Sequence, residues 1–339
     1  MTGGMTQLRV ILGLVLLCAA APAESAVVWE SKDGIEQFRI NTERLSGVFV
    51  ARDTRDLKRG FARHGLRQLV FKPIGPDLHA PEGKVGAKRR HQGHLNLYRV
   101  YAGNETFGSL RDDLAELKRL KDGAQLNWPA SDKRPVEVTA SWRLSGPAQI
   151  DLHLKATPKR DLKNFEILPA SYCPVNMVKH VYLSRDGKPT PVAVKTPTDP
   201  ATAKLYPFYP LTAADRAPQE ATGRIHSTWK WPTTVAKENA ALPIVFASDH
   251  HTEIILMGDP ASTSAVCATP RPGSGQPEDW NSVGQHSALY LSFFCRDVKA
   301  GETVTARARL VFREPSAVQS APHIRHYREF VAETGGNRN

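Results

Sequence analysis

The segment PVEVTASWRLSGPAQIDLHL, residues 135–154, alternates apolar and polar side chains with a period of two. That period is typical of a β-strand with one buried face. Ser145-Gly146-Pro147 interrupts the pattern with turn-forming residues, so the segment predicts two strands that pair antiparallel. The apolar residues of the first strand would share one face: Val136, Val138, Ala140, Trp142 and Leu144.

The same alternation recurs along the chain. Residues 303–312 alternate after a turn at 299–302, and Ser287–Cys295 is almost entirely apolar, as expected of a strand covered on both faces. Other expected strands are 38–41, 47–51, 94–102, 225–231, 244–247 and 253–257. Because no Gly/Pro-rich segment divides the pattern, the sequence predicts one all-β, antiparallel β-sandwich domain over residues 24–335, with a disordered tail at 336–339.

Two helices are expected against this background. Ser109–Asp122 has an N-cap serine, a leucine stripe, cations in its last turn and Gly123 behind it. Ile324–Glu333 carries apolar side chains at helical spacing.

The first residues have the features of a signal peptide. Arg9 precedes the apolar run Val10–Ala21, which is too short to cross a bilayer, and Ala21-Pro22-Ala23 supplies small residues for cleavage after Ala23. No later segment is apolar enough to span a membrane. We therefore expect residues 1–23 to be a signal peptide and the protein to be secreted or periplasmic.

The formal net charge is +11, and four cations fall within residues 84–90. A basic excess favours a polyanionic partner, which outside the cell means an acidic or sulfated glycan or the cell envelope rather than nucleic acid. The alternative is a solvated basic loop that binds nothing. Nothing in the sequence fixes the oligomeric state.

Three cysteines follow the signal peptide, so at most one intramolecular disulfide can form. Cys267 and Cys295 flank segments that are expected to be neighbouring strands, which favours a bridge between them. Cys173 would then be a buried thiol.

The segment HQGHLNLYRVYA, residues 91–102, mixes polar and aromatic side chains on an expected strand. A saccharide site needs donors and acceptors for hydroxyls and an aromatic wall for the apolar ring face. The alternative is an edge strand with a hydrated face. If the alternation is regular, one face carries His94, Asn96 and Tyr98, with the stem of Arg99 on the other.

Other candidates lie further along the chain. Trp229, with His226 on the opposite face of 225–231, suits a stacking platform or a core equally well. Glu166 has apolar neighbours that would raise its pKa and suit it to acid–base work, or it points to water. Tyr172 is an accessory candidate, and His250 follows a strand end, where loops present functional groups.

Several well-marked motifs are absent from the sequence. It has no GxSxG elbow, HExxH helix, P-loop or dinucleotide fingerprint, which removes serine hydrolases, zinc proteases, and nucleotide- and nicotinamide-dependent enzymes. The residues 249–253 match no strong metal-ligand spacing. We expect no metal and no cofactor.

The order of an apolar strand, a GE turn and a long alternating strand, SALYLSFFCRDVKAGETVTARARLVF at 287–312, resembles the galactose-mutarotase-like super-sandwich superfamily. That superfamily includes aldose epimerases and sugar-binding domains of glycoside hydrolases and polysaccharide lyases. The resemblance implies a carbohydrate ligand on a concave sheet face. It also implies an acid–base pair made of a histidine, here His94 or His226, and a carboxylate, here Glu166.

The leading hypothesis is a secreted carbohydrate-active protein that binds a saccharide, and processes it if the histidine and carboxylate act as in a hydrolase, lyase or epimerase. A non-catalytic glycan- or envelope-binding module is the alternative, and a purely structural sandwich is a third. The predicted catalytic residues are His94, Glu166 and His226, and the predicted binding residues are His91, Asn96, Tyr98, Arg99, Tyr172, Trp229 and His250.

Overall fold

The computed structural model describes residues 26–54, 64–73, 93–174, 177–195, 206–222, 233–269, 287–315 and 322–335. The expected signal peptide, the basic segment at 84–90, the expected strand at 225–231 and the tail at 336–339 lie outside these residues. The described residues form three sheets, and every strand pair is antiparallel except β14 with β15.

The largest sheet has nine strands. Their spatial order is β13 (Lys188–Ala193), β12 (Val178–Arg185), β16 (Ala240–Ser248), β17 (Glu253–Gly258), β20 (Val304–Arg313), β10 (Gln149–Pro158), β9 (Val136–Gly146), β8 (Gly123–Trp128) and β7 (Glu116–Leu120). The predicted pairing of the two strands in 135–154 is confirmed, because Trp142 of β9 lies opposite Leu152 of β10.

The other two sheets have seven and four strands. The seven-stranded sheet runs β15 (Thr233–Val235), β14 (Tyr206–Pro210), β18 (Thr263–Ala268), β19 (Ala288–Val298), β11 (Leu162–Tyr172), β5 (Asn96–Ala102) and β6 (Glu105–Thr106). The four-stranded sheet runs β1 (Val27–Lys32), β2 (Ile35–Asn41), β3 (Leu45–Asp53) and β4 (Gly65–Phe71). The predicted interior position of 287–295 is confirmed, since β19 lies between β18 and β11.

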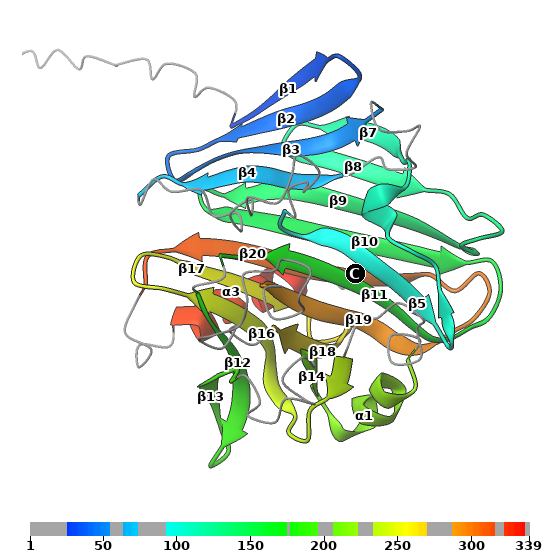
Figure 1. Ribbon diagram of the computed structural model, residues 1–339, viewed down its shortest axis with the longest axis vertical. Helices are drawn as coiled ribbons and strands as arrows, with labels where there is room; N and C mark the ends of the chain where they lie inside the picture. The colour runs from blue at the N-terminus through cyan, green and yellow to red at the C-terminus, as the bar shows by residue number, and fades with distance from the viewer. Residues whose placement is uncertain are drawn as a thin grey trace, which may run out of the picture.

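Figure 1 shows how the three sheets are arranged. One continuous apolar core joins them. The nine-stranded sheet packs its inner face on the seven-stranded sheet at β5, β11 and β19, and on the four-stranded sheet near β9. Phe49 of β3 lies 5.0 Å from Trp142, measured between ring centroids. The chain is therefore an all-β sandwich, as the alternation predicted, and the seven-stranded sheet keeps an outer face turned away from this core.

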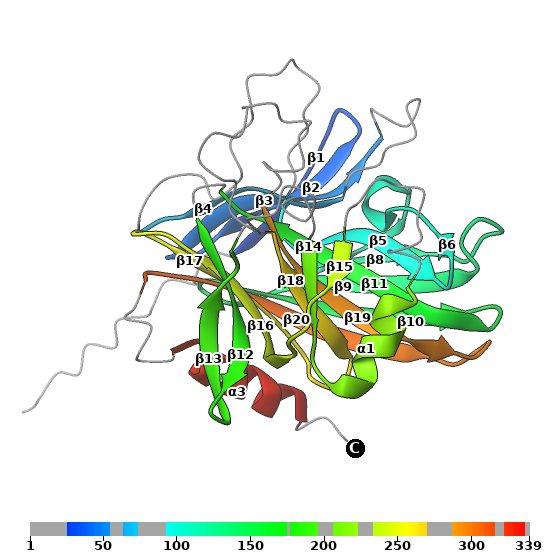
Figure 2. The ribbon, with the colours of Figure 1, turned by 60° about the horizontal axis from the view of Figure 1, so that its bottom comes forward.

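Two helices lie outside the sandwich (Figure 2). Helix α1 (Ala213–Glu220) packs near β14 and β18, and α3 (Pro322–Gly335) covers the outer face of the nine-stranded sheet with Tyr327 and Phe330. The predicted helix at 324–333 is confirmed by α3. No described helix is long and apolar enough to cross a membrane.

The helix predicted at Ser109–Asp122 is wrong. The segment forms a single 3-10 turn, η2 (Leu110–Asp112), and then strand β7, which pairs with β8 through Leu117 opposite Leu126. Leu114, part of the expected stripe, is 46% exposed. Pairing with the neighbouring strand outweighs the helical propensity of these residues, which is worth only tenths of a kcal/mol each.

The predicted disulfide is also wrong. Cys267 does lie on a strand next to the strand of Cys295, but its partner in the register is Tyr290. The two cysteines are thus five residues out of register, about 16 Å along the strand, which no disulfide can bridge. All three described cysteines are buried and unbridged, and burial raises the pKa of the Cys173 thiol.

Helix α3 is fastened to the sheet by a buried arginine. Arg309 of β20 donates to both oxygens of Asp151 at 2.7 and 2.8 Å, and it also binds Glu333 near the end of α3. The hydrogen bond from Arg309 lowers the pKa of the Glu333 carboxyl below its ordinary value of 4.5. Because the pKa of Glu333 is lower in the folded than in the unfolded state, the ionised carboxylate stabilises the fold fully at pH values above the ordinary pKa of 4.5. This contribution is lost as the pH falls through the lower pKa of the folded protein.

We therefore expect Glu333→Gln to lower the free energy of unfolding at pH 7 by on the order of 1 kcal/mol or less, because the side chain is largely exposed. The melting temperature should fall accordingly. The difference from the wild type should vanish as the pH falls well below 4.5. Thermal denaturation across this range measures it, with the exposed Glu43→Gln as control. A difference that does not change with pH would contradict the assignment.

A second prediction concerns the junction of β4 with the start of β5. A Cβ atom at Gly93 would lie 1.5 Å from the carbonyl oxygen of Leu66, a backbone atom that cannot turn aside. Gly93→Ala must push the segment before β5 away from β4, so we expect it to lower the free energy of unfolding by about 3 kcal/mol in urea titrations. Gly146→Ala, whose Cβ would meet only the flexible Gln149 side chain, should lose no more than about 1 kcal/mol. Equal losses would sink the prediction.

Candidate functional site

The outer face of the seven-stranded sheet is rich in tyrosine. Strand β11 turns Glu166, Leu168, Ala170 and Tyr172 to this face, because alternate residues of a strand point the same way. Neighbouring strands add phenol rings at matching positions. The tyrosines of this face are Tyr98, Tyr101, Tyr172, Tyr206 and Tyr290.

Tyr98 is presented by an irregularity in β5. In the register with β11, Arg99 lies opposite Leu168 and Leu97 lies opposite Pro169, so Tyr98 is the extra residue of a β-bulge. Proline has no N–H to give to the ladder, and such residues commonly sit at bulges. The bulge turns both Tyr98 and Arg99 to the outer face, where the guanidinium carbon of Arg99 lies 4.1 Å from the Tyr98 ring centroid.

A second arginine reaches the same ring from η2. The guanidinium carbon of Arg111 lies 5.0 Å from the centroid of Tyr98, and its Nε atom is 3.7 Å from Asp112. Its backbone oxygen accepts a 2.9 Å hydrogen bond from the N–H of His64, which fixes the turn to the residue before β4. Tyr98 is therefore flanked by two cations, and it is the partly exposed ring of this cluster.

Tyr172 completes the cluster. Its ring meets that of Tyr98 edge to face at 6.4 Å between centroids, and its hydroxyl interacts with Arg111. Burial raises the pKa of Tyr172 to about 12, although the positive charge of Arg111 opposes the shift. At neutral pH this side chain is a phenol that donates a proton in hydrogen bonds, not a phenolate base. We call Tyr98, Arg99, Arg111 and Tyr172 the Tyr98 cluster.

Glu166 lies elsewhere on the same face, within a buried polar network. Its two carboxylate oxygens accept hydrogen bonds from the hydroxyls of Ser292 and Thr222, the latter at 2.8 Å. Gln219 of α1 donates to Ser292 at 2.7 Å and to Ser264 at 3.1 Å. The carboxylate is fully buried and holds the end of α1 on the sheet.

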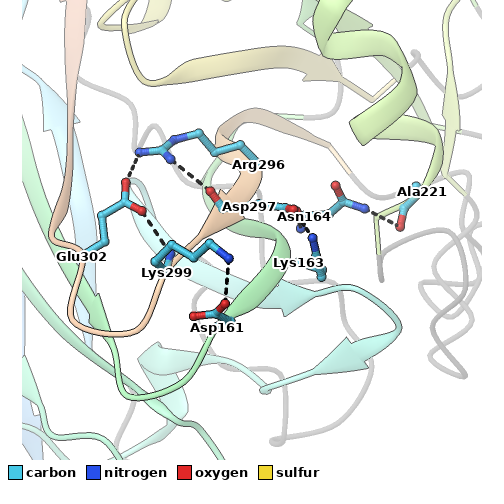
Figure 3. Close-up of polar contacts among 8 residues, drawn as sticks. All are labelled: Asp161, Lys163, Asn164, Ala221, Arg296, Asp297, Lys299 and Glu302. Atoms are coloured by element: carbon cyan, nitrogen blue, oxygen red, sulfur yellow. Dashed lines mark hydrogen bonds and ion pairs between the residues drawn. The ribbon is translucent and has the colours of Figure 1, made fainter.

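The end of α1 has a second attachment (Figure 3). The Asn164 side chain donates to the carbonyl oxygen of Ala221 at 3.3 Å, next to Thr222. Around it, Lys163 with Asp297 joins the start of β11 to the end of β19, and Lys299 with Asp161 joins the β19–β20 turn to the β10–β11 turn. These pairs are largely exposed and contribute little each, so the buried network carries most of the attachment.

Spacing along β11 separates Glu166 from Tyr172, although Arg99 of the Tyr98 cluster lies opposite Leu168, only two residues from Glu166. Glu166 and Tyr172 are six residues apart on one strand, which corresponds to about 20 Å. Two groups at that separation do not act on one sugar carbon, since paired glycosidase carboxyls lie about 5 to 10 Å apart.

The expected common face of His94, Asn96 and Tyr98 is only partly formed. Leu95 adopts a positive φ of 49°, so alternation begins only at Asn96, where β5 starts. His94 is instead fully buried and packs edge to face on Phe312 of the nine-stranded sheet, 5.4 Å between centroids. Its ring therefore lies in the core, on the opposite side of the sheet from Glu166.

Asn96 and Arg99 differ from expectation in smaller ways. Asn96 lies opposite Ala170 and so shares the outer face with Tyr98, but it is buried and donates to the carbonyl oxygen of Gly93. Arg99 was expected on the face opposite Tyr98, and the bulge brings it to the same one. His91, His226 and Trp229 lie outside the described residues, so their roles stay predictions.

His250 is exposed in the β16–β17 turn of the other large sheet, away from the Tyr98 cluster. Asp249 there accepts from the backbone N–H groups of His251 and Thr252 at 2.8 Å, as in an Asx turn. Glu253 instead contacts His323 and Arg313 under α3. Within the ranges that the structure covers, no three His, Cys, Asp or Glu side chains gather as metal ligands.

Sequence reasoning missed several members of the site. Arg111 was assigned to the wrongly predicted helix, and α1 was not predicted, although Thr212 and Asp215 form a capping box at its start. That box is the signal that would have found α1.

No protein-family model and no curated protein matches the sequence. Similar solved structures include galactose 1-epimerase from Lactobacillus acidophilus, with a TM-score of 0.44, 10% identity, and 86% of this chain and 98% of that chain covered. An aldose epimerase homologue from C. elegans has a TM-score of 0.44, 9% identity, and 83% and 100% covered. A heparan sulfate lyase mutant from Pedobacter heparinus has a TM-score of 0.41, 8% identity, and 88% and 38% covered.

At TM-scores below 0.5 these likenesses are similarities only. They concern the fold alone, and the functional argument rests on the residues.

Replacing Glu166 tests the structural role of its network. Glu166→Gln puts an amide donor where a hydroxyl now donates, which leaves a buried polar group unsatisfied. We expect a loss of about 1 to 3 kcal/mol in the free energy of unfolding, measured by urea denaturation. The exposed Glu43→Gln is the matched control and should be neutral. A neutral Glu166→Gln would show that the network does not hold α1.

Proposed function

We propose that this protein binds a saccharide on the outer face of its seven-stranded sheet, with the Tyr98 ring as the stacking platform. The observation that carries the proposal is the state of this ring. It is partly exposed, yet an edge-to-face contact with Tyr172 and a tilted contact with Tyr290 hold it, at 6.4 and 6.1 Å between centroids. An aromatic ring that is already held in place loses little entropy when a sugar packs against its exposed part.

The surroundings of Tyr98 supply the polar half of such a site. Guanidinium groups donate several hydrogen bonds in a fixed plane, and Arg99 is oriented by a 2.8 Å hydrogen bond to the carbonyl oxygen of Tyr98. Sugar hydroxyls need this mixture of directed donors and an apolar face. Trp229, His226 and His91 remain proposed contacts from the sequence.

Glycan binding without turnover is the version that the chemistry supports best. Both oxygens of Glu166 already accept hydroxyl hydrogen bonds, and this carboxylate is about 20 Å along the strand from Tyr172. His94 faces the core. A hydrolase, lyase or epimerase would need another proton-transfer pair, for which His226 is the proposed histidine.

The proposal includes export. The signal-peptide pattern of residues 1–23 supports a secreted or periplasmic protein, and envelope or extracellular glycans are the ligands available there.

Binding of the purified protein to neutral, uronic-acid and sulfated oligosaccharides, measured by calorimetry, tests the proposal. We expect Tyr98→Ala to weaken binding at least about tenfold, or about 1.4 kcal/mol, because the stacking face is lost. Tyr98→Phe, which keeps the ring, should stay close to the wild type, and melting curves of both variants check the fold. Equal binding by wild type and Tyr98→Ala, or no binding to any glycan, would refute the platform.

A further inference from the structure

We propose that helix α3 is a pH-sensitive cover, which lies on the outer face of the nine-stranded sheet at neutral pH and detaches from it as the pH falls. The inference concerns a different face from the proposed saccharide site and does not depend on it. It begins from the attachment of the helix at both ends. His323, its second residue, contacts Glu253 of β17, and Glu333, near its last residue, pairs with Arg309 of β20.

The contacts of His323 suit a neutral imidazole. The ring is fully buried, with Nδ1 2.8 Å from the hydroxyl oxygen of Tyr182 and Nε2 3.2 Å from a carboxylate oxygen of Glu253. Burial raises the pKa of Tyr182 to about 12, so its O–H stays protonated and donates to Nδ1, while the Nε2–H donates to Glu253. A second proton on the ring would occupy Nδ1 and remove the acceptor of a buried hydroxyl, which is costly.

A second histidine lies beside the first, across one aromatic ring. Phe246 of β16 is stacked between His323 and His180 of β12, at 4.2 and 4.6 Å between centroids. The two imidazoles are therefore at most about 9 Å apart, roughly one Debye length at physiological ionic strength, and a proton on one ring opposes a proton on the other. Burial, and then the nearby His323, lowers the pKa of His180 below its ordinary value of 6.5.

His326 is the third histidine of this interface, three residues further along α3. Burial lowers its pKa below 6.5; Glu329 opposes the shift and Arg313 of β20 adds to it. A histidine whose pKa is lower in the folded protein stabilises the fold at pH values above 6.5, and this contribution is lost as the pH falls through the lower pKa. His180 and His326 therefore both favour release of the helix in acid.

The carboxylates that face these rings already have cationic partners at neutral pH. Arg313 contacts Glu253 at 3.3 Å, and Arg309 contacts both Asp151 and Glu333. Protons on the histidines therefore add positive charge to an interface whose ion pairs are already formed. The titratable and charged groups around the three rings are Tyr182 on β12, Glu253 on β17, Arg309 and Arg313 on β20, Asp151 on β10, and Arg325, Glu329 and Glu333 on α3.

Detachment of α3 leaves the sheets intact. The helix docks through side chains, Tyr327 and Phe330 among them, and contributes no strand to any of the three sheets. The sheet residues under it are apolar or aromatic: Tyr182, Ile244, Phe246, Ile255, Met257 and Val311. Acid would thus expose an apolar surface on a sandwich that stays folded.

Hydrogen exchange followed by mass spectrometry tests the proposal. Protection factors, which correct for the pH dependence of intrinsic exchange, are compared at about pH 7.5 and about pH 5 for peptides from α3 and from β9 and β10. We expect protection in α3 to fall at least about tenfold, the factor that corresponds to one pKa unit, while β9 and β10 keep theirs. The double variant His180→Phe, His326→Gln should remove most of this fall, because Phe keeps the stack on Phe246 and neither side chain takes a proton.

His251→Gln, an exposed histidine in the β16–β17 turn, is the matched control and should keep the full pH dependence. If the double variant melts early, the comparison of α3 with β9 and β10 in the wild type still decides. Protection in α3 that does not change with pH overturns the proposal. An equal loss in β9 and β10 overturns it too, because the whole fold then opens, and so does a double variant that loses protection as fully as the wild type.

Discussion

Trp142 is the residue on which the arrangement of the three sheets depends. It belongs to β9 of the nine-stranded sheet, packs on Phe49 of the four-stranded sheet, and donates its indole N–H to the carbonyl oxygen of Leu95 at 3.0 Å. Leu95 leads into β5 of the seven-stranded sheet and has a positive φ there. One buried side chain thus fixes where β5 begins, and with it which residues of that strand reach the outer face.

The strands were predictable because alternation is a local signal. In 135–154 each apolar position predicted to be buried in β9 or β10 belongs to the core or packs against it, and the turn between them lies where Gly146 and Pro147 placed it. The failure at 109–122 has the opposite cause. Its leucines fit a helix by spacing, but the segment pairs with β8, which follows it directly and is itself paired with β9, so contacts within the sheet decide the outcome.

The site was less predictable because irregular backbone builds it. Strict alternation predicts that Arg99 lies on the other face of the strand from Tyr98 and that His94 lies on the same face. Both predictions are wrong because the backbone is irregular: the positive φ at Leu95 and the bulge opposite Pro169 each shift the side-chain alternation by one residue. A proline inside a central strand is the visible clue to the bulge. Nothing local in residues 109–113 indicates that Arg111 will meet Tyr98.

The outer face of the seven-stranded sheet carries two groups of polar residues, the Glu166 network and the Tyr98 cluster. Around Glu166 the polar groups are buried and hydrogen-bonded to hydroxyl or amide groups. A buried network that is satisfied in this way makes the structure around it rigid. Around Tyr98 the guanidinium groups of Arg99 and Arg111 lie against one partly exposed ring. The buried network thus accounts for the attachment of α1, and the partly exposed Tyr98 ring is the surface on which the proposed saccharide site rests.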